Sequence, residues 1–195
     1  MFANSSNMPR SKIILAFVGM PGAGKSEAAQ YLDQLGIPFI RFGKFTEEAI
    51  LEAKVPITTE NERLFREKLR EEFGMGAYAI KAKPKIDEML KVHDYIALDG
   101  LYSWEEYTYL KEFFPFLKLI LIYAEPEIRY KRLSQRPIRP VSLDKTYSRD
   151  VNELEKLNKG GPIAIADHLI ENNTEDLSAL HQKIDALLKK LSINV

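Results

Sequence analysis

The feature that most limits the fold of this 195-residue chain is the segment Gly19-Met20-Pro21-Gly22-Ala23-Gly24-Lys25-Ser26. An apolar run, Ile13–Val18, leads directly into this segment, and a stretch with helical periodicity at about 24–35 follows it. The glycines permit backbone conformations that other residues rarely adopt, so the segment can curl tightly. It therefore predicts a buried strand, a tight loop and a helix in immediate succession.

This loop matches the pattern G-x-x-x-x-G-K-[ST], which predicts a phosphate-binding P-loop. Its backbone N–H groups and the N-terminus of the following helix would point toward a phosphate group. We expect Lys25 to bridge the terminal phosphates of ATP and the Ser26 hydroxyl to bind Mg²⁺. The alternative is a glycine-rich turn without a ligand, but the match extends over both flanks. The residues expected at the nucleotide are Gly19, Pro21, Gly22, Ala23, Gly24, Lys25, Ser26 and Glu27.

Short apolar runs alternate with longer helical patterns along the chain, which favours an α/β fold with a parallel sheet between layers of helices. We interpret the chain as a single domain with a flexible N-terminus over residues 1–12. The expected strands are Ile13–Val18, 37–40, 95–98, Leu117–Tyr123 and His168–Glu171. The expected helices are about 24–35, 46–91 with breaks near Pro56 and Gly74, 104–114, 127–135 and 174–191.

An acidic residue, Asp99, stands at the end of the third expected strand, in the sequence Leu98-Asp99-Gly100. In open parallel sheets, ligands bind at the carboxyl ends of the strands. Asp99 is therefore a candidate for holding Mg²⁺ or for accepting a proton from the phosphoryl acceptor. The alternative is a structural Asp-Gly turn, which is a common use of this dipeptide.

The stretch 128–143 carries five basic side chains and no acidic one; they are Arg129, Lys131, Arg132, Arg136 and Arg139. The three- and four-residue spacing of Arg129, Arg132 and Arg136 predicts that they share one helix face. Phosphoryl transfer needs positive charge around the moving group, and an arginine-rich lid over about 128–145 would supply it. We expect Arg132 and Arg136 to act with Lys25 and Asp99 in catalysis, and Arg132 also to contact the nucleotide. The alternatives are a solvated basic face and a surface for RNA.

The charge balance gives no support for a broad basic surface, because Lys and Arg total 28 and Asp and Glu also total 28, but it leaves a local basic patch open. We therefore expect no nucleic-acid partner. The chain has no cysteine, which excludes disulfides and cysteine-ligated zinc. No apolar run approaches the roughly eighteen residues of a membrane helix. We expect a cytoplasmic protein that binds no membrane, and the sequence leaves a homodimer open.

Several further segments match known proteins in a fixed order: 69–74, 98–100 followed by Ser103, Arg129, 132–133, Arg136, 149–150, and 165–167 with Ile170 and Asn172. Together with the P-loop, they make the chain resemble the nucleoside-monophosphate-kinase-like branch of P-loop NTPases. Within it, the chain is similar to dephospho-coenzyme A kinase and to an archaeal group of kinase-like P-loop proteins. The resemblance implies a five-stranded parallel sheet flanked by helices, a helical acceptor-binding region at about 43–92 and an arginine-bearing lid. It also implies ATP-dependent phosphorylation of a small acceptor such as a nucleoside monophosphate, a deoxynucleoside monophosphate or dephospho-coenzyme A.

The chain departs from this pattern on the acceptor side. Lys44 follows Gly43 where the related kinases usually carry an aspartate, and a protonated lysine cannot accept a proton. Tyr102 stands where the archaeal group tends to carry an arginine. Arg41, Lys44, Arg63 and Arg70 remain candidates for holding an anionic acceptor, with Asp99 as base. The alternative functions are an ATP-binding regulator or slow ATPase with a degenerate acceptor site and, third, an RNA-processing partner.

Overall fold

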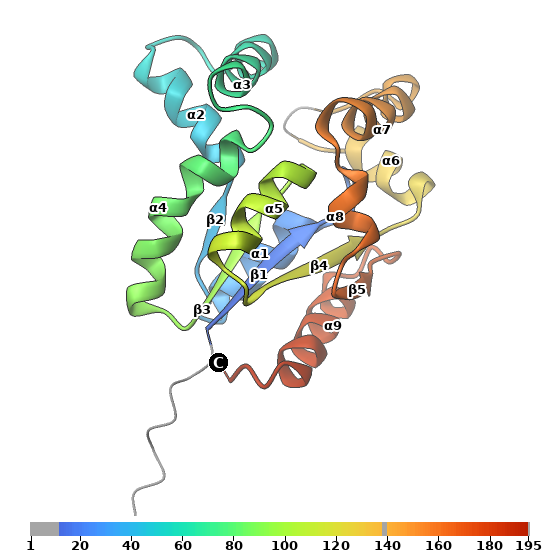
Figure 1. The fold of residues 1–195 in the computed structure, drawn as a ribbon. Coiled ribbons are helices and arrows are strands. Elements are labelled where there is room, and N and C mark those ends of the chain that lie inside the picture. The colour runs from blue at the N-terminus through green and yellow to red at the C-terminus, as the bar shows by residue number, and fades with distance from the viewer. Residues whose placement is uncertain (1–11, 138–139, 195) are drawn as a thin grey trace, which may run out of the picture.

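A computed structural model describes residues 12–137 and 140–194, and these residues form a five-stranded parallel sheet with helices on both faces (Figure 1). The expected α/β fold is thereby confirmed. Most of the predicted flexible N-terminus, residues 1–11, lies outside the described residues. The strands in spatial order are β2 (Phe39–Arg41), β3 (Tyr95–Asp99), β1 (Ile13–Val18), β4 (Leu117–Tyr123) and β5 (His168–Glu171).

Helices of the described chain cover both faces of this sheet and extend beyond the carboxyl ends of its strands (Figure 1). They are α1 (Lys25–Gln34), α2 (Gly43–Glu52), α3 (Thr59–Phe73), α4 (Ala77–Val92), α5 (Trp104–Phe113), α6 (Pro126–Ser134), α7 (Leu143–Leu157), α8 (Gly160–Ala164) and α9 (Leu177–Lys190). None of these helices is long and apolar enough to cross a membrane.

The sheet is buried on both faces, which explains why its strands are continuously apolar rather than alternating. Successive residues of β1 enter different cores: Ile14 and Ala16 pack on the side of α4 and α5, whereas Leu15 and Phe17 pack on the side of α1 and α9. Apolar residues on the inner faces of these helices complete both cores. Burial on two sides therefore fixes the register of the central strand.

The strand order places the P-loop beside Asp99. Strand β1 lies between β3 and β4, and Phe17 pairs in register with Asp99 of β3. The loop that follows β1 therefore leaves the sheet at the same edge at which β3 ends. The strand order reverses at β1, so the connections on its two sides run in opposite directions. Ligands of open parallel sheets bind at this position, at the carboxyl ends of the strands.

Three features of the structure differ from the sequence-based expectations. The second strand covers 39–41 instead of 37–40, and helices α7 and α8 were not expected. Helix α6 ends at Ser134, so Arg136 does not share a helix face with Arg129 and Arg132, and that prediction was wrong. Pro137 disfavours the helical conformation at Arg136, which accounts for the early end.

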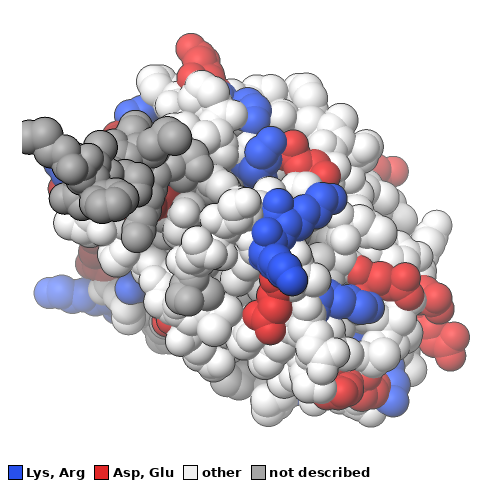
Figure 2. All heavy atoms as spheres, turned by 90° about the horizontal axis from the view of Figure 1, so that it is seen from below, with Lys and Arg blue, Asp and Glu red and all other residues white. Residues whose placement is uncertain are grey.

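The surface of the molecule mixes charges of both signs. On the face seen from below in Figure 2, Lys and Arg side chains of the described residues lie close to Asp and Glu side chains. This distribution agrees with the equal totals of 28 basic and 28 acidic residues. It offers no support on this face for a broad nucleic-acid surface.

Truncating the buried stripe of α9 should destabilise the fold. Ile184 is 1% exposed and packs in the core between α9, α1 and the sheet. We expect Ile184→Ala to lower the free energy of unfolding by about 2–5 kcal/mol, because it removes buried methyl groups and leaves a cavity. Urea denaturation measures the change, and Gln182→Ala, exposed on the same helix, is the matched control. Equal midpoints for the two variants would contradict this assignment of the core.

Candidate active site

The P-loop is held by glycines that no other residue could replace without strain. Gly19, Gly22 and Gly24 have φ angles of 138°, 82° and 106°, in the region that favours glycine. A Cβ atom on Gly19 would lie 2.3 Å from the backbone oxygen of Ile122, and one on Gly22 would lie 2.7 Å from that of Arg129. The loop is therefore packed directly against the backbone of β4 and α6.

Three residues that the sequence singled out meet at this loop. The Lys25 Nζ donates hydrogen bonds to the carbonyl oxygens of Gly19 and Met20, at 2.8 and 3.0 Å. The Ser26 Oγ donates to Asp99 Oδ2 at 2.8 Å. Asp99 is 4% exposed, so its carboxylate is fixed beside the first turn of α1. Because a hydroxyl and a carboxylate oxygen are ligands that Mg²⁺ prefers, these residues fit the predicted metal site.

The charge of Lys25 is strongly influenced by its surroundings. Burial lowers the pKa of Lys25 to about 7, and the positive charge of Lys159 adds to this effect. The negative charges of Asp99 and Glu153 oppose it. An anion at the loop would stabilise the charged form of Lys25, which is the interaction that a phosphate-binding lysine requires.

Arg129 fastens the P-loop to the helices that follow β4. Its side chain donates to the carbonyl oxygens of Ala124 and Pro21, each at 3.1 Å. Its guanidinium also forms a two-pronged ion pair with Asp150 of α7, at 3.0 and 2.6 Å. Arg129 is 5% exposed, so its position indicates a structural role rather than the mobile lid role expected from the sequence.

The other two predicted lid arginines lie nearer the surface. Arg132 donates to the carbonyl oxygens of Gly22 and Thr174, at 3.5 and 2.5 Å, so it adjoins the P-loop. Partial burial and the positive charge of Arg149 lower the pKa of Arg136, while Glu153 and Glu27 act in the opposite direction. Arg139 lies outside the described residues.

Asn172, just after β5, contributes to the P-loop in a way that the sequence did not reveal. Its Nδ2 donates to the carbonyl oxygen of Ala23 at 2.8 Å, and a Cβ atom on Gly24 would lie 2.4 Å from that nitrogen. Asn172 is buried. The sequence marked it only as part of a matched segment, because its contact with the loop depends on the tertiary fold.

The predicted acceptor-binding residues do not form one cluster. Arg41 pairs with Glu47 at 2.5 Å, and Lys44, 56% exposed, lies 3.8 Å from Glu48. Both side chains therefore lie toward solvent, and Arg63 likewise forms an exposed pair within α3.

Arg70 differs from these three side chains because it is partly buried. Its guanidinium carbon lies 5.6 Å from the ring centre of Tyr78, and its Nε has no hydrogen-bond partner among the described residues. Tyr78 in turn shares a hydrogen bond of 2.5 Å with Thr46. Of these four predicted residues, Arg70 is therefore the one whose side chain reaches into the fold.

A buried carboxylate at the start of α5 was not predicted. Glu106 forms a capping box at the start of α5, where its Oε2 accepts from the backbone N–H of Tyr102 at 2.7 Å and of Ser103 at 3.3 Å. Burial raises the pKa of Glu106 to about 7, although these bonds and the charge of Arg70 oppose the rise. A Ser-x-x-Glu pattern is a helix-start signal and could have identified the cap, but not the burial.

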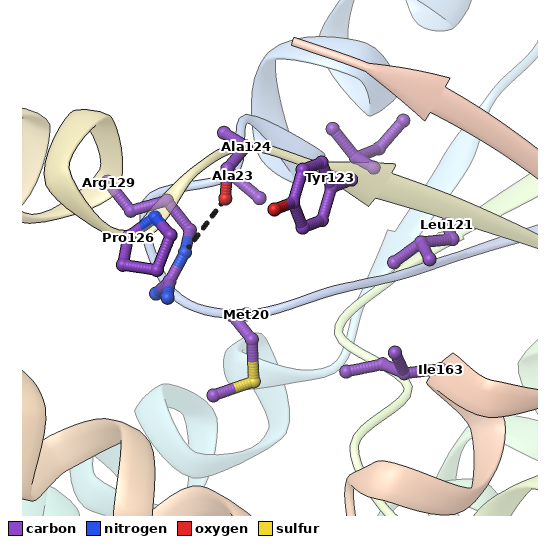
Figure 3. Close-up of a pocket in the computed structure, with 9 residues that line it drawn as sticks. Met20, Ala23, Leu121, Tyr123, Ala124, Pro126, Arg129 and Ile163 are labelled. Carbon is purple, nitrogen blue, oxygen red and sulfur yellow. Dashed lines mark hydrogen bonds between the residues drawn. The ribbon is translucent and has the colours of Figure 1, made fainter. Parts of the chain in front are cut away.

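A small apolar cavity of about 160 Å³ lies beside the P-loop at the end of β4 (Figure 3). Figure 3 shows the Arg129 side chain and Pro126 at one end of this cavity and Ile163 at the other, with Met20 between them. Its lining is mostly apolar, and it does not include Lys25 and Ser26, the side chains predicted to meet the phosphates and Mg²⁺. The cavity is thus distinct from the predicted phosphate site.

Comparisons with known proteins define the class. Residues 15–156 match the family described as AAA domain. The shikimate kinase of Bacteroides thetaiotaomicron superposes with a TM-score of 0.59 at 16% identity, covering 92% of this chain and 98% of that one. A gluconokinase of Sinorhizobium meliloti 1021 superposes with a TM-score of 0.56 at 16% identity, covering 94% and 95%. The fold is therefore that of the P-loop kinases.

More similar relatives identify the family. The chain is 36% identical over 185 residues to a UPF0200 protein of Thermococcus sibiricus, covering 93% of this chain and 96% of that protein. It is 32% identical over 183 residues to a UPF0200 protein of Pyrococcus abyssi, covering 92% and 97%. The chain belongs to the UPF0200 family, and the expected resemblance to archaeal kinase-like P-loop proteins is confirmed.

Removing Asp150, the ion-pair partner of Arg129, should destabilise the folded protein. We expect Asp150→Ala to lower the free energy of unfolding by about 3–5 kcal/mol, because it leaves a buried guanidinium without its counterion. Thermal or urea unfolding measures the loss, and Glu155→Ala, exposed on the same helix, is the control. The double variant Arg129→Met with Asp150→Leu should recover much of the stability, because no buried charge is left unpaired. If Asp150→Ala changed the free energy of unfolding no more than Glu155→Ala does, the structural role of the Arg129–Asp150 pair would be contradicted.

Glu106 should make stability depend on pH. Its pKa in the folded protein is about 7, above the ordinary value of 4.5, so the folded state retains a proton that the unfolded state releases. Stability should therefore fall as pH rises from about 4.5 to 7, by up to about 3 kcal/mol. Glu106→Gln, which keeps an acceptor for the cap, should remove this loss, whereas the exposed Glu112→Gln should retain it. Urea midpoints at pH 5 and pH 8 test this, and parallel profiles for wild type and Glu106→Gln would refute it.

Proposed function

We propose that this protein is a kinase that transfers the γ-phosphoryl group of Mg²⁺-ATP to a small nucleotide or nucleotide-like acceptor. The observation that carries the proposal is the 2.8 Å hydrogen bond between Ser26 Oγ and Asp99 Oδ2, directly beside the P-loop lysine. It joins a candidate metal-binding hydroxyl to a buried carboxylate at the ligand-binding edge of the sheet. The similarity of the fold to shikimate kinase and gluconokinase supports the same reaction class.

Magnesium fits the oxygen atoms available at this position. Ser26 and Asp99 would hold the ion, directly or through water, and the phosphates would supply further ligands. No group of three or more His, Cys, Asp or Glu side chains suited to a metal occurs among the described residues, and Mg²⁺ at phosphate sites needs none. When bound, the ion would neutralise charge on the phosphate oxygens.

The side chains of the chain would supply positioning and charge. The P-loop N–H groups and Lys25 would bind the phosphates, and Arg132 and Arg136 would stabilise negative charge on the transferred group. The acceptor oxygen would form a bond to the γ-phosphorus as the bond to the bridging oxygen of ADP breaks. Asp99 would take the proton of a hydroxyl acceptor, whereas a monophosphate acceptor needs no base.

Arg70 is the best supported candidate for binding an anionic group of the acceptor. Its partial burial beside Tyr78 and its Nε without a hydrogen-bond partner among the described residues both favour an additional ligand. Arg41 and Lys44 are paired and solvent-facing, so they would contribute at the rim. The exposure of Lys44, in place of an inward-facing acid, also favours a second candidate function, an ATP-binding regulator or slow ATPase.

ADP formation from Mg²⁺-ATP tests the proposal. We would add nucleoside monophosphates, deoxynucleoside monophosphates and dephospho-coenzyme A in turn, with Lys25→Ala as the blank and the exposed Lys189→Ala as the matched control. We expect one acceptor class to stimulate ADP formation at least about 100-fold over Lys25→Ala, because removing preorganised charge from a transition state costs rates of this order. Binding of ATP without stimulation by any acceptor would favour the regulator instead.

A further inference from the structure

Lys159 is a buried lysine that the proposed mechanism leaves without a role. It lies between α7 and α8 and is only 1% exposed. Its ammonium forms an ion pair with Glu153 and lies 4.8 Å from the ring centre of Tyr102. Lysine is rarely buried to this degree, so the position requires an explanation.

A chain of contacts through Tyr102 connects Lys159 with the phosphate site, and its charge acts on the same site. Tyr102, which lies below its ammonium, packs back on Gly100, where an added Cβ atom would lie 3.0 Å from the tyrosine hydroxyl. Gly100 directly follows Asp99, the hydrogen-bond partner of Ser26. The positive charge of Lys159 also lowers the pKa of the P-loop Lys25, after the larger effect of burial. Through Tyr102 and Gly100, Lys159 therefore adjoins the end of β3, where Asp99 meets the P-loop serine.

The local balance of charge favours an anion. Glu153 is shared between Lys159 and Arg149, whose Nε lies 3.5 Å from its Oε1. Four basic groups stand against three carboxyl groups in this cluster; they are Lys25, Arg136, Arg149 and Lys159 against Asp99, Glu106 and Glu153. Mutually repelling buried ammonium groups create a positive potential that an incoming phosphate would relieve.

The ion pair with Glu153 does not by itself account for Lys159. Desolvation of two charges offsets most of their attraction, so a buried pair of this kind contributes little net stability compared with apolar side chains. A lysine held in one orientation beside a P-loop, however, is well prepared to bind phosphate oxygen without further loss of side-chain entropy. Glu153 is thus the residue that positions Lys159.

We propose that Lys159 is a second phosphate-binding lysine, which contacts the γ-phosphate of the bound nucleoside triphosphate together with Lys25. This inference rests on the proposed nucleotide site. It goes beyond that function because it assigns to Lys159 the discrimination of a triphosphate from a diphosphate. A contact made only to the γ-phosphate strengthens the binding of ATP and leaves that of ADP almost unchanged.

Equilibrium binding of a non-hydrolysable Mg²⁺-ATP analogue and of Mg²⁺-ADP tests this assignment. Lys159→Met should weaken binding of the triphosphate at least about 10-fold, as expected for one charge-assisted hydrogen bond, and that of the diphosphate less than about 3-fold. Lys159→Arg should keep most of the preference, because it keeps the charge. Lys156→Met, exposed near the end of α7, is the matched control and should leave both affinities unchanged.

Nitrogen NMR of lysine side chains in the wild-type protein gives a second readout that needs no destabilised variant. The Lys159 signal, assigned by its absence in Lys159→Arg, should shift more with the triphosphate analogue than with ADP. The proposal would be overturned if Lys159→Met weakened the binding of both nucleotides equally. It would also be overturned if the Lys159 signal did not shift in a protein that binds ATP through Lys25. Either result would leave the kinase function standing. Failure of the wild type to bind either nucleotide would overturn both.

Discussion

The buried guanidinium of Arg129 connects segments that no single helix or strand could hold together. Through Pro21 it bonds to the P-loop, through Ala124 to the end of β4, and through Asp150 to α7. A charge in this position is stable only while all its partners remain in place. The conformation of the loop, the direction of α6 and the docking of α7 therefore depend on one another, and the charged residues of α7 reach the site as a consequence.

Much of the fold could be predicted from the sequence, because strands buried on both faces leave an unambiguous apolar run. The bounds of β1, β4 and β5 were predicted without error, and the breaks near Pro56 and Gly74 do separate the helices α2, α3 and α4. Helix α7 was missed although its apolar residues Leu143, Tyr147 and Leu154 recur at helical spacing, because the preceding prolines suggested an irregular segment. These side chains are largely exposed in the structure, where the buried Asp150 of α7 pairs with Arg129, so the apolar pattern does not reveal what holds the helix in place.

Some residues of the candidate site could be predicted from the local sequence, whereas others are brought to it only by the tertiary fold. Lys25 and Ser26 belong to one motif with fixed spacing, and Asp99 stands at a strand end, so the sequence predicted that these residues meet. Lys159 and Asn172 come from other parts of the chain, and only the packing of the helices and β5 brings them to the site. The burial of Glu106 at the start of α5 likewise depends on the tertiary fold. The misassigned Arg136 shows the converse, because one proline was enough to end the helix on which its predicted position depended.

The hydrogen bond from Asn172 to the carbonyl oxygen of Ala23 has a consequence for how the protein is made. The loop is synthesised early, but a residue that fastens it follows β5, the last strand. During translation, the glycine-rich segment would leave the ribosome long before its anchor exists. The nascent chain would thus carry the complete P-loop sequence before the loop is held in its folded conformation. The hydrogen bond from Asn172 could form only once β5 has joined the edge of the sheet.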